Sequence, residues 1–256
     1  MEKQLIHWPR ESPKMEIAGD SSVINALEEL IGRFDSDRFA VIEGPSGSGK
    51  TELISYLSAV AYSQGQSVVS FDLHSPFVNG SVLHFSEQAN QIRENPDKRY
   101  LVLEEDFVQI DLSDAGLAKE FFSFIDEASV KNYHLIATAS EIESQVKDRA
   151  KVFKWEGAKS PEQKAQLMKY KLKHDICEIS EEEFGRLGQQ AYNANLSGRA
   201  ITDICRQVVS KCLGSIYKRP ELLNPDVKIE FSQNVSYETM EKAMADSIKE
   251  QAFFTF

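Results

Sequence analysis

Short apolar runs alternate with longer amphipathic stretches over the first 157 residues. The runs are four or five residues long and rich in β-branched and aromatic side chains, which predicts strands at 39–42, 67–71, 100–103, 134–138 and 152–155. Before and between these runs, apolar residues recur every three or four positions, which predicts helices at 20–34, 52–62, 83–93 and 113–128. Continuous apolar strands that alternate with helices indicate an αβα sandwich with a central parallel sheet of five strands.

The pattern after Gly157 is almost entirely helical. Two of the expected helices begin with a capping box, Ser160-Pro161-Glu162-Gln163 and Ser180-Glu181-Glu182-Glu183. The expected helices span 160–174, 180–194, 200–217 and 237–251, and one strand-like run lies at 227–231. We therefore predict two domains: an αβα domain at 1–157, whose first 20 residues are irregular, and a small all-helical domain at 158–256.

The residues after the first expected strand carry the pattern G-x-x-x-x-G-K-T, from Gly44 to Thr51. A strand, a glycine-rich loop and a helix in this order are the context that a phosphate-binding loop requires. The glycines let backbone N–H groups converge on phosphate oxygens, and the start of the helix adds its positive dipole end. Lys50 can reach the β- and γ-phosphates, and the Thr51 hydroxyl suits Mg²⁺. The expected nucleotide-binding residues are Gly44, Pro45, Ser46, Gly47, Ser48, Gly49, Lys50, Thr51 and Glu52.

Acidic residues end the third expected strand. Glu104 and Glu105 stand at the carboxyl end of that strand, which is where ligands bind in such sheets. Hydrolysis of a bound nucleotide needs an acid that orders Mg²⁺ and a carboxylate that activates water. A register shifted by one residue, with Glu105 and Asp106 as the pair, is an open alternative.

Composition narrows the class of protein. The net charge of −11 disfavours broad binding to a phosphate backbone, so we expect contact with DNA to be indirect or weak. Three cysteines in 256 residues form no disulfide framework. No apolar run is long enough to span a membrane, and the N-terminus has no signal-peptide pattern. We expect a cytoplasmic protein that does not enter a membrane.

These motifs together resemble the AAA+ ATPase superfamily over residues 20–250. The run Leu196-Ser197-Gly198-Arg199 and the helix after it are similar to the second sensor element of AAA lids, and residues 236–244 are similar to the last lid helix. The resemblance implies ATP and Mg²⁺ as cofactors, with the nucleotide between the αβ domain and a helical lid. It also implies self-association into a ring or filament, commonly a hexamer, whose subunits complete one another's sites.

The resemblance assigns roles to the residues of the loop and of the third strand. It implies that Lys50 binds phosphate and that Thr51 binds Mg²⁺. Glu104 falls where the family usually has an aspartate that binds the metal through water, and Glu105 falls where it has the catalytic glutamate. A glutamate in place of aspartate is longer by one methylene, which affects the expected hydrolysis rate more than binding.

The resemblance also implies sensor and arginine-finger residues. Thr138 or Ser140 is the expected first sensor of the γ-phosphate, and Arg199 is the expected second sensor. Arg149 resembles the finger that acts on a neighbouring subunit's nucleotide, with Lys151 as the alternative.

The loop Phe77-Val78-Asn79-Gly80 is similar to a pore loop, although an ordinary turn with one packed aromatic explains it equally well.

Three functions are compatible with these features. The first is an ATPase that remodels a protein client or adaptor as an oligomer. The second is a DnaA- or Hda-type ATP switch that regulates DNA replication, suggested by the small size and by the runs at 4–9 and 149–182. The third is an ATP-binding scaffold with slow turnover, which the glutamate at position 104 permits.

Overall fold

The computed structural model describes residues 6–7, 17–33, 38–71, 82–105, 115–127, 132–172, 177–217 and 235–253. The expected strand at 227–231, the loop at 77–80 and Asp106 lie outside these residues. The chain divides into two compact units. Unit 1 contains Met1–Glu16 and Asp20–Glu156, and unit 2 contains Ile17–Gly19 and Gly157–Phe256.

The five expected strands form one parallel sheet. They are β2 (Phe39–Glu43), β3 (Ser67–Ser70), β4 (Tyr100–Glu104), β5 (Tyr133–Ala139) and β6 (Lys151–Lys154), in the spatial order β3-β4-β5-β2-β6. Strands β2, β4 and β5 are buried along their whole length, as their continuous apolar sequences require. The predicted fold class is confirmed.

A sixth strand departs from the prediction. Strand β1 (Ile6–His7) pairs antiparallel with β3 at the edge of the sheet, within the N-terminal segment that we expected to be irregular. Two residues are too short for a periodic pattern. Their conformation depends on the open edge of β3, which local sequence does not reveal.

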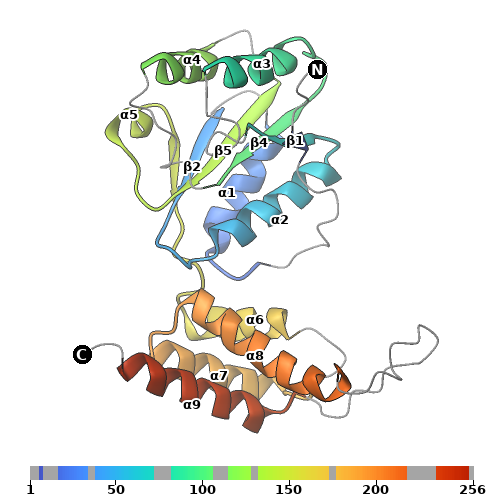
Figure 1. The fold of residues 1–256 in the computed structure, drawn as a ribbon, viewed down its shortest axis with the longest axis vertical. Coiled ribbons are helices and arrows are strands. Elements are labelled where there is room, and N and C mark those ends of the chain that lie inside the picture. Colours follow the sequence, from blue (N-terminus) through green and yellow to red (C-terminus); the bar gives the residue numbers. More distant parts are fainter. Residues whose placement is uncertain are drawn as a thin grey trace, which may run out of the picture. The chain divides into compact units, whose positions relative to one another are not determined.

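Helices cover both faces of this sheet (Figure 1). One face carries α1 (Ser21–Gly32) and α2 (Lys50–Ser63), and the other carries α3 (Val82–Arg93) and α4 (Ala115–Asp126). A four-residue helix, α5 (Ser144–Lys147), precedes β6 and is too short to have been predicted. The core beneath α3 and α4 is aromatic: the rings of Phe39, Phe71, Phe85, Phe121 and Phe124 meet mostly edge to face.

Unit 2 is a bundle of α6 (Pro161–Lys171), α7 (Glu181–Asn193), α8 (Gly198–Tyr217) and α9 (Tyr237–Phe253). Both predicted capping boxes are confirmed, Ser160 with Gln163 and Ser180 with Glu183. Helices α6 and α7 approach closely at Gly188, where an added Cβ would lie 2.3 Å from the carbonyl oxygen of Pro161. None of the helices within the described residues is long and apolar enough to cross a bilayer.

Cys205 provides a test of this packing. Its thiol lies in the core of unit 2, 1% exposed, and burial raises its pKa to about 12. A thiol with this pKa is almost entirely protonated at pH 8 and is shielded from reagents. We expect iodoacetamide at pH 8 to leave Cys205 unmodified in the native protein and to alkylate it in denaturant, as read by peptide mass spectrometry. Rapid alkylation of Cys205 under native conditions would contradict the packing of α8.

Candidate functional site

The loop between β2 and α2 is shaped by backbone hydrogen bonds and by two glycines. The N–H of Gly44 donates to Ala139 O at 3.0 Å, and the N–H of Ser48 donates to Pro45 O at 3.2 Å. Gly47 (φ 77°) and Gly49 (φ 88°) occupy the left-handed region, which side-chain-bearing residues rarely adopt. Gly49 is also the N-cap of α2 and offers no side-chain cap. The first N–H groups of α2 therefore face the loop without a capping side chain, which is the arrangement that binds anions.

Lys50 begins α2 and folds back onto this loop. Its ammonium donates to the carbonyl oxygens of Gly44 at 2.7 Å and Pro45 at 3.1 Å. Thr51, the next residue, is exposed in the first turn of α2. The expected phosphate-binding residues thus surround one loop at the carboxyl end of β2.

Trp155 donates hydrogen bonds to the loop and to the end of β2. The sequence motifs assigned it no role at the site. Its indole N–H donates to Ser48 O at 3.0 Å, and its backbone N–H donates to Glu43 O at 2.7 Å. The residue is 1% exposed. The position follows from the parallel pairing of β6 with β2, which brings the end of β6 next to Glu43. No local motif at 152–155 signals this pairing.

The backbone of Trp155 lies so close to Gly44 that no side chain fits at position 44. A Cβ built there would lie 1.9 Å from the carbonyl oxygen of Trp155. Gly44 is therefore required by close backbone contact, whereas Gly47 and Gly49 are required by their φ angles.

The expected first-sensor residues lie at the end of β5, the strand beside β2. Thr138 is opposite Ile42 in the register of β5 with β2, and it is 2% exposed. Ser140 follows the end of β5 and is exposed. Thr138 and Ser140 flank Ala139 in the sequence, and the carbonyl of Ala139 accepts from the N–H of Gly44 at the start of the loop. Either hydroxyl therefore belongs to a residue adjacent to this hydrogen bond.

The two acidic residues at the end of β4 have different surroundings. Glu104 is fully buried, and its carboxylate accepts from the Ser70 hydroxyl at 3.1 Å and from the N–H of Phe71. These partners are at the end of β3, whereas β5 separates β4 from the loop strand β2. Glu105 follows β4 and is only partly buried. The structure thus brings Glu104 into contact with β3 and leaves Glu105 accessible.

Arg149, the expected finger, makes contacts within unit 1. Its guanidinium lies 4.6 Å from the ring centroid of Phe122, and its Nε lies 3.5 Å from Asp126 Oδ2. The alternative, Lys151, is exposed, with its ammonium 5.7 Å from the ring centroid of Phe153. Arg149 and Lys151 are therefore both on the surface near α4 and β6.

Arg199, the expected second sensor, is exposed in the first turn of α8 in unit 2. The turn before it is fixed by Lys164, a buried lysine whose ammonium donates to Leu196 O. Burial lowers the pKa of Lys164. The Ser197 hydroxyl accepts from the N–H of Ala200 at 3.2 Å and caps the helix. These two hydrogen bonds fix the start of α8, where Arg199 lies.

The comparisons with known proteins give the fold. No protein-family model matches the sequence, and no curated protein matches it. The structure is similar to that of the FIGL-1 AAA domain, with a TM-score of 0.67 at 14% identity over 98% of this chain and 90% of that chain. The same domain in complex with ADP gives a TM-score of 0.67 at 14% identity, over 99% and 93%.

This chain has an AAA domain fold. C. elegans PCH-2 is a further neighbour, with a TM-score of 0.61 at 16% identity over 92% of this chain and 70% of that chain. The AAA+ resemblance inferred from the motifs is confirmed at the level of the fold. The resemblance to DnaA- and Hda-type regulators is not shown by these likenesses.

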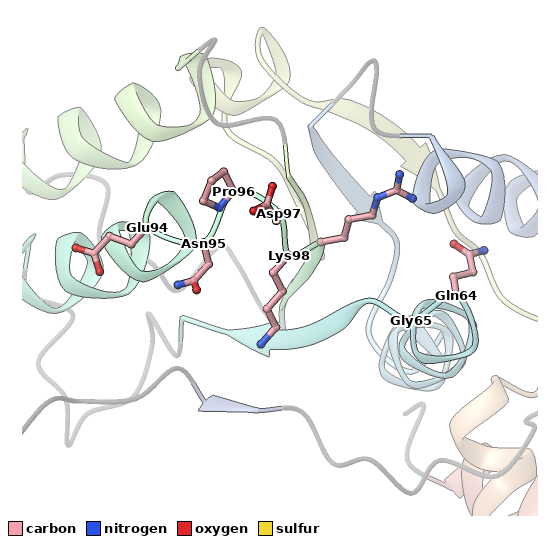
Figure 2. Close-up of a pocket in the computed structure, with 8 residues that line it drawn as sticks. Gln64, Gly65, Glu94, Asn95, Pro96, Asp97 and Lys98 are labelled. Atoms are coloured by element: carbon pink, nitrogen blue, oxygen red, sulfur yellow. The ribbon is translucent and has the colours of Figure 1, made fainter.

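A surface pocket of about 610 Å³ lies at the opposite edge of the sheet in this AAA domain fold. It is lined by Gln64 and Gly65, which follow α2, and by the turn before β4, which carries Asp97 and Lys98 (Figure 2). This edge holds the amino ends of β3 and β4. In parallel sheets ligands bind at the carboxyl ends, so the loop at 44–52 is the candidate site and the pocket is not.

Replacement of Gly44 tests the close contact with Trp155. Gly44→Ala should lower the free energy of unfolding by about 1–3 kcal/mol, because its methyl group must displace backbone. Gly32→Ala, also in unit 1, is the matched control. Its Cβ meets nothing within 4 Å, and alanine at the end of α1 should raise stability by up to about 1 kcal/mol. Equal unfolding midpoints for Gly44→Ala and the wild type in urea would show that the loop is looser than described.

Proposed function

We propose that this chain binds ATP with Mg²⁺ at the loop 44–52 and hydrolyses it, and that it self-associates to remodel a protein client or adaptor. The geometry of the loop carries the proposal: two left-handed glycines, an uncapped helix start and a lysine ammonium belong to one short loop and the first residue of α2. That combination favours the phosphates of a nucleotide over uncharged ligands. The ADP complex of the similar FIGL-1 AAA domain supports the same ligand class.

The residues of the loop fit a nucleotide phosphate chain. The ammonium of Lys50 can exchange the carbonyl oxygens of Gly44 and Pro45 for β- and γ-phosphate oxygens, a stronger charge-assisted pairing. The buried Oγ of Ser48 has no hydrogen-bond partner among the described residues, and a buried hydroxyl is normally bonded. Pro45, Ser46 and Glu52 are the other residues of this stretch that we expect to bind the nucleotide.

Mg²⁺ fits the donor set available here. No group of three histidine, cysteine or acidic residues that could hold a metal occurs in the described ranges. Mg²⁺ needs no such cage, because it retains several waters and binds phosphate oxygens with one or two protein ligands. The hydroxyl of Thr51 would supply one ligand, and Glu104 would contribute through water. Bound Mg²⁺ supplies neutralisation of charge on the phosphates.

Exposure and strand position support the proposed catalytic roles. Glu105 is the accessible carboxylate after β4, and it is the residue that can accept a proton from an attacking water. Thr138 or Ser140, at the end of β5, donates to the γ-phosphate. Arg199 is the expected second sensor of the γ-phosphate.

Self-association completes the proposal. Arg149, or Lys151 in its place, acts on the nucleotide of a neighbouring subunit, where a guanidinium stabilises charge on the transferred phosphoryl group. Arg149 must leave Asp126 and Phe122 to do so. An exposed pair of this kind contributes little stability, so the rearrangement costs little. This chain is also similar to a structure described as the basis for katanin self-assembly, with a TM-score of 0.59 at 14% identity over 93% of this chain and 89% of that chain. That likeness supports an oligomer. The expected form is a hexameric ring.

A second function, an ATP-binding scaffold with slow turnover, is favoured by the contacts of Glu104. Its Oε1 accepts from the Ser70 hydroxyl and from the N–H of Phe71, so the buried carboxylate is held at the end of β3, and β5 separates β4 from the loop strand. A carboxylate held there orders water at the loop less effectively, which slows hydrolysis without affecting the loop that binds ATP.

Lys50→Ala tests the site. We expect it to abolish Mg·ATP binding, measured by isothermal titration calorimetry, because the phosphates lose their cationic ligand. Lys98→Ala is the matched control, since Lys98 is an exposed lysine at the other edge of the same sheet, packed on Tyr100. Retained tight binding by Lys50→Ala would place the nucleotide elsewhere, and absence of binding by the wild type would refute the proposal.

Glu105→Gln tests the base. Loss of general-base catalysis should lower ATP hydrolysis about 100-fold or more while ATP affinity is kept. Glu94→Gln, an exposed glutamate at the distant pocket, should hydrolyse ATP at the wild-type rate. Hydrolysis that survives Glu105→Gln but is lost in Glu104→Gln would move the base to Glu104. Wild-type turnover as slow as that of Glu105→Gln would favour the scaffold.

A further inference from the structure

Trp155 is bound to both ends of one backbone segment. Its backbone N–H holds the carbonyl of Glu43, where the loop begins, and its indole N–H holds the carbonyl of Ser48, next to the last loop glycine. Its own carbonyl oxygen packs against Gly44 so closely that no Cβ fits there. A single buried residue thus constrains the loop at Glu43, Gly44 and Ser48.

The hydrogen bond to Ser48 also fixes the direction of a neighbouring donor. In a trans peptide the C=O and the following N–H point in opposite directions. Because Ser48 O is turned towards the indole, the N–H of Gly49 is turned away from it. Gly49 is the left-handed N-cap of α2, so its N–H belongs to the group of donors at the start of that helix. The indole therefore orients a donor that it does not itself touch.

We propose that Trp155 is a positioning residue for the phosphate loop, holding the Ser48–Gly49 peptide in the orientation that binds phosphate. This inference rests on the proposed binding of ATP at the same loop. Without the indole N–H, the peptide can rotate about the flexible glycine, and binding must then restrict that motion at the expense of affinity. The effect depends on the phosphates alone, so it is the same for ATP, ADP and GTP.

The expected result of Trp155→Phe is a loss of about tenfold in affinity for Mg·ATP and for Mg·ADP, the amount that one net hydrogen bond of about 1.4 kcal/mol represents. In steady-state hydrolysis KM should rise by a similar factor while kcat changes less than twofold, because the indole does not contact the reacting atoms. Hydrogen exchange of the amides at 47–50 should be faster in the nucleotide-free variant than in the wild type.

Tyr133→Phe is the matched control. It removes a buried donor in the same unit, the hydroxyl that donates to Phe124 O at 3.0 Å at the amino end of β5. It should lower stability comparably but leave nucleotide affinity and loop exchange unchanged. If Trp155→Phe binds as tightly as the wild type, or if Tyr133→Phe loses as much affinity, the positioning role is wrong.

Fluorescence provides a measurement that leaves Trp155 intact. The sequence contains two tryptophans, so Trp8→Phe leaves Trp155 as the sole tryptophan. Bound phosphate, and the departure of Lys50 from the loop carbonyls, change the electric field at the indole. We expect an emission change that saturates at the calorimetric Kd and is absent from Trp8→Phe/Lys50→Ala.

Calorimetric binding by Trp8→Phe with no emission change would overturn the inference. If the wild type does not bind ATP at all, the proposed function on which this inference rests is wrong.

Discussion

The parallel pairing of β2 between β5 and β6 is the constraint on which the site depends. Each side of that pairing fixes one part of the loop: β5 supplies the carbonyl of Ala139 to Gly44, and the residue after β6 supplies the donors to Glu43 and Ser48. A strand whose neighbours are parallel on both sides ends where theirs end. The polar residues that follow these strands are therefore gathered at one edge of the sheet.

Burial explains why this edge can be polar while the strands remain stable. The central strands are covered on both faces, with the aromatic core beneath α3 and α4 on one face. Two carboxylates at this edge have partners: Glu104 is held by Ser70 and Phe71, and Glu43 by the ammonium of Lys154. An unpaired carboxylate at either position would carry a large desolvation cost. The pairing of Glu104 with β3 consequently links its chemistry to the conformation of a neighbouring strand.

Much of the fold could be predicted because its signals are local. The apolar runs at 39–42 and 134–138 are strands because they are buried on both faces, and the capping boxes at Ser160 and Ser180 begin helices through hydrogen bonds within four residues. Strand β1 and helix α5 could not be predicted, because two and four residues carry no periodicity. The candidate site divides in the same way. The glycines and Lys50 follow from their spacing, whereas Trp155 follows from no motif.

The sequence by itself determined that a strand, a phosphate loop and a helix follow one another, since each depends on residues close in the chain. Only the tertiary structure decided which distant residues reach that loop. Trp155 lies 107 residues from Ser48 in the sequence. The carboxylate of Glu104 accepts hydrogen bonds from Phe71 and Ser70, which lie 33 and 34 residues before it. Strand order decides both, because parallel pairing is set by the packing of whole helices against a sheet. No local pattern of side chains predicts the order of the strands.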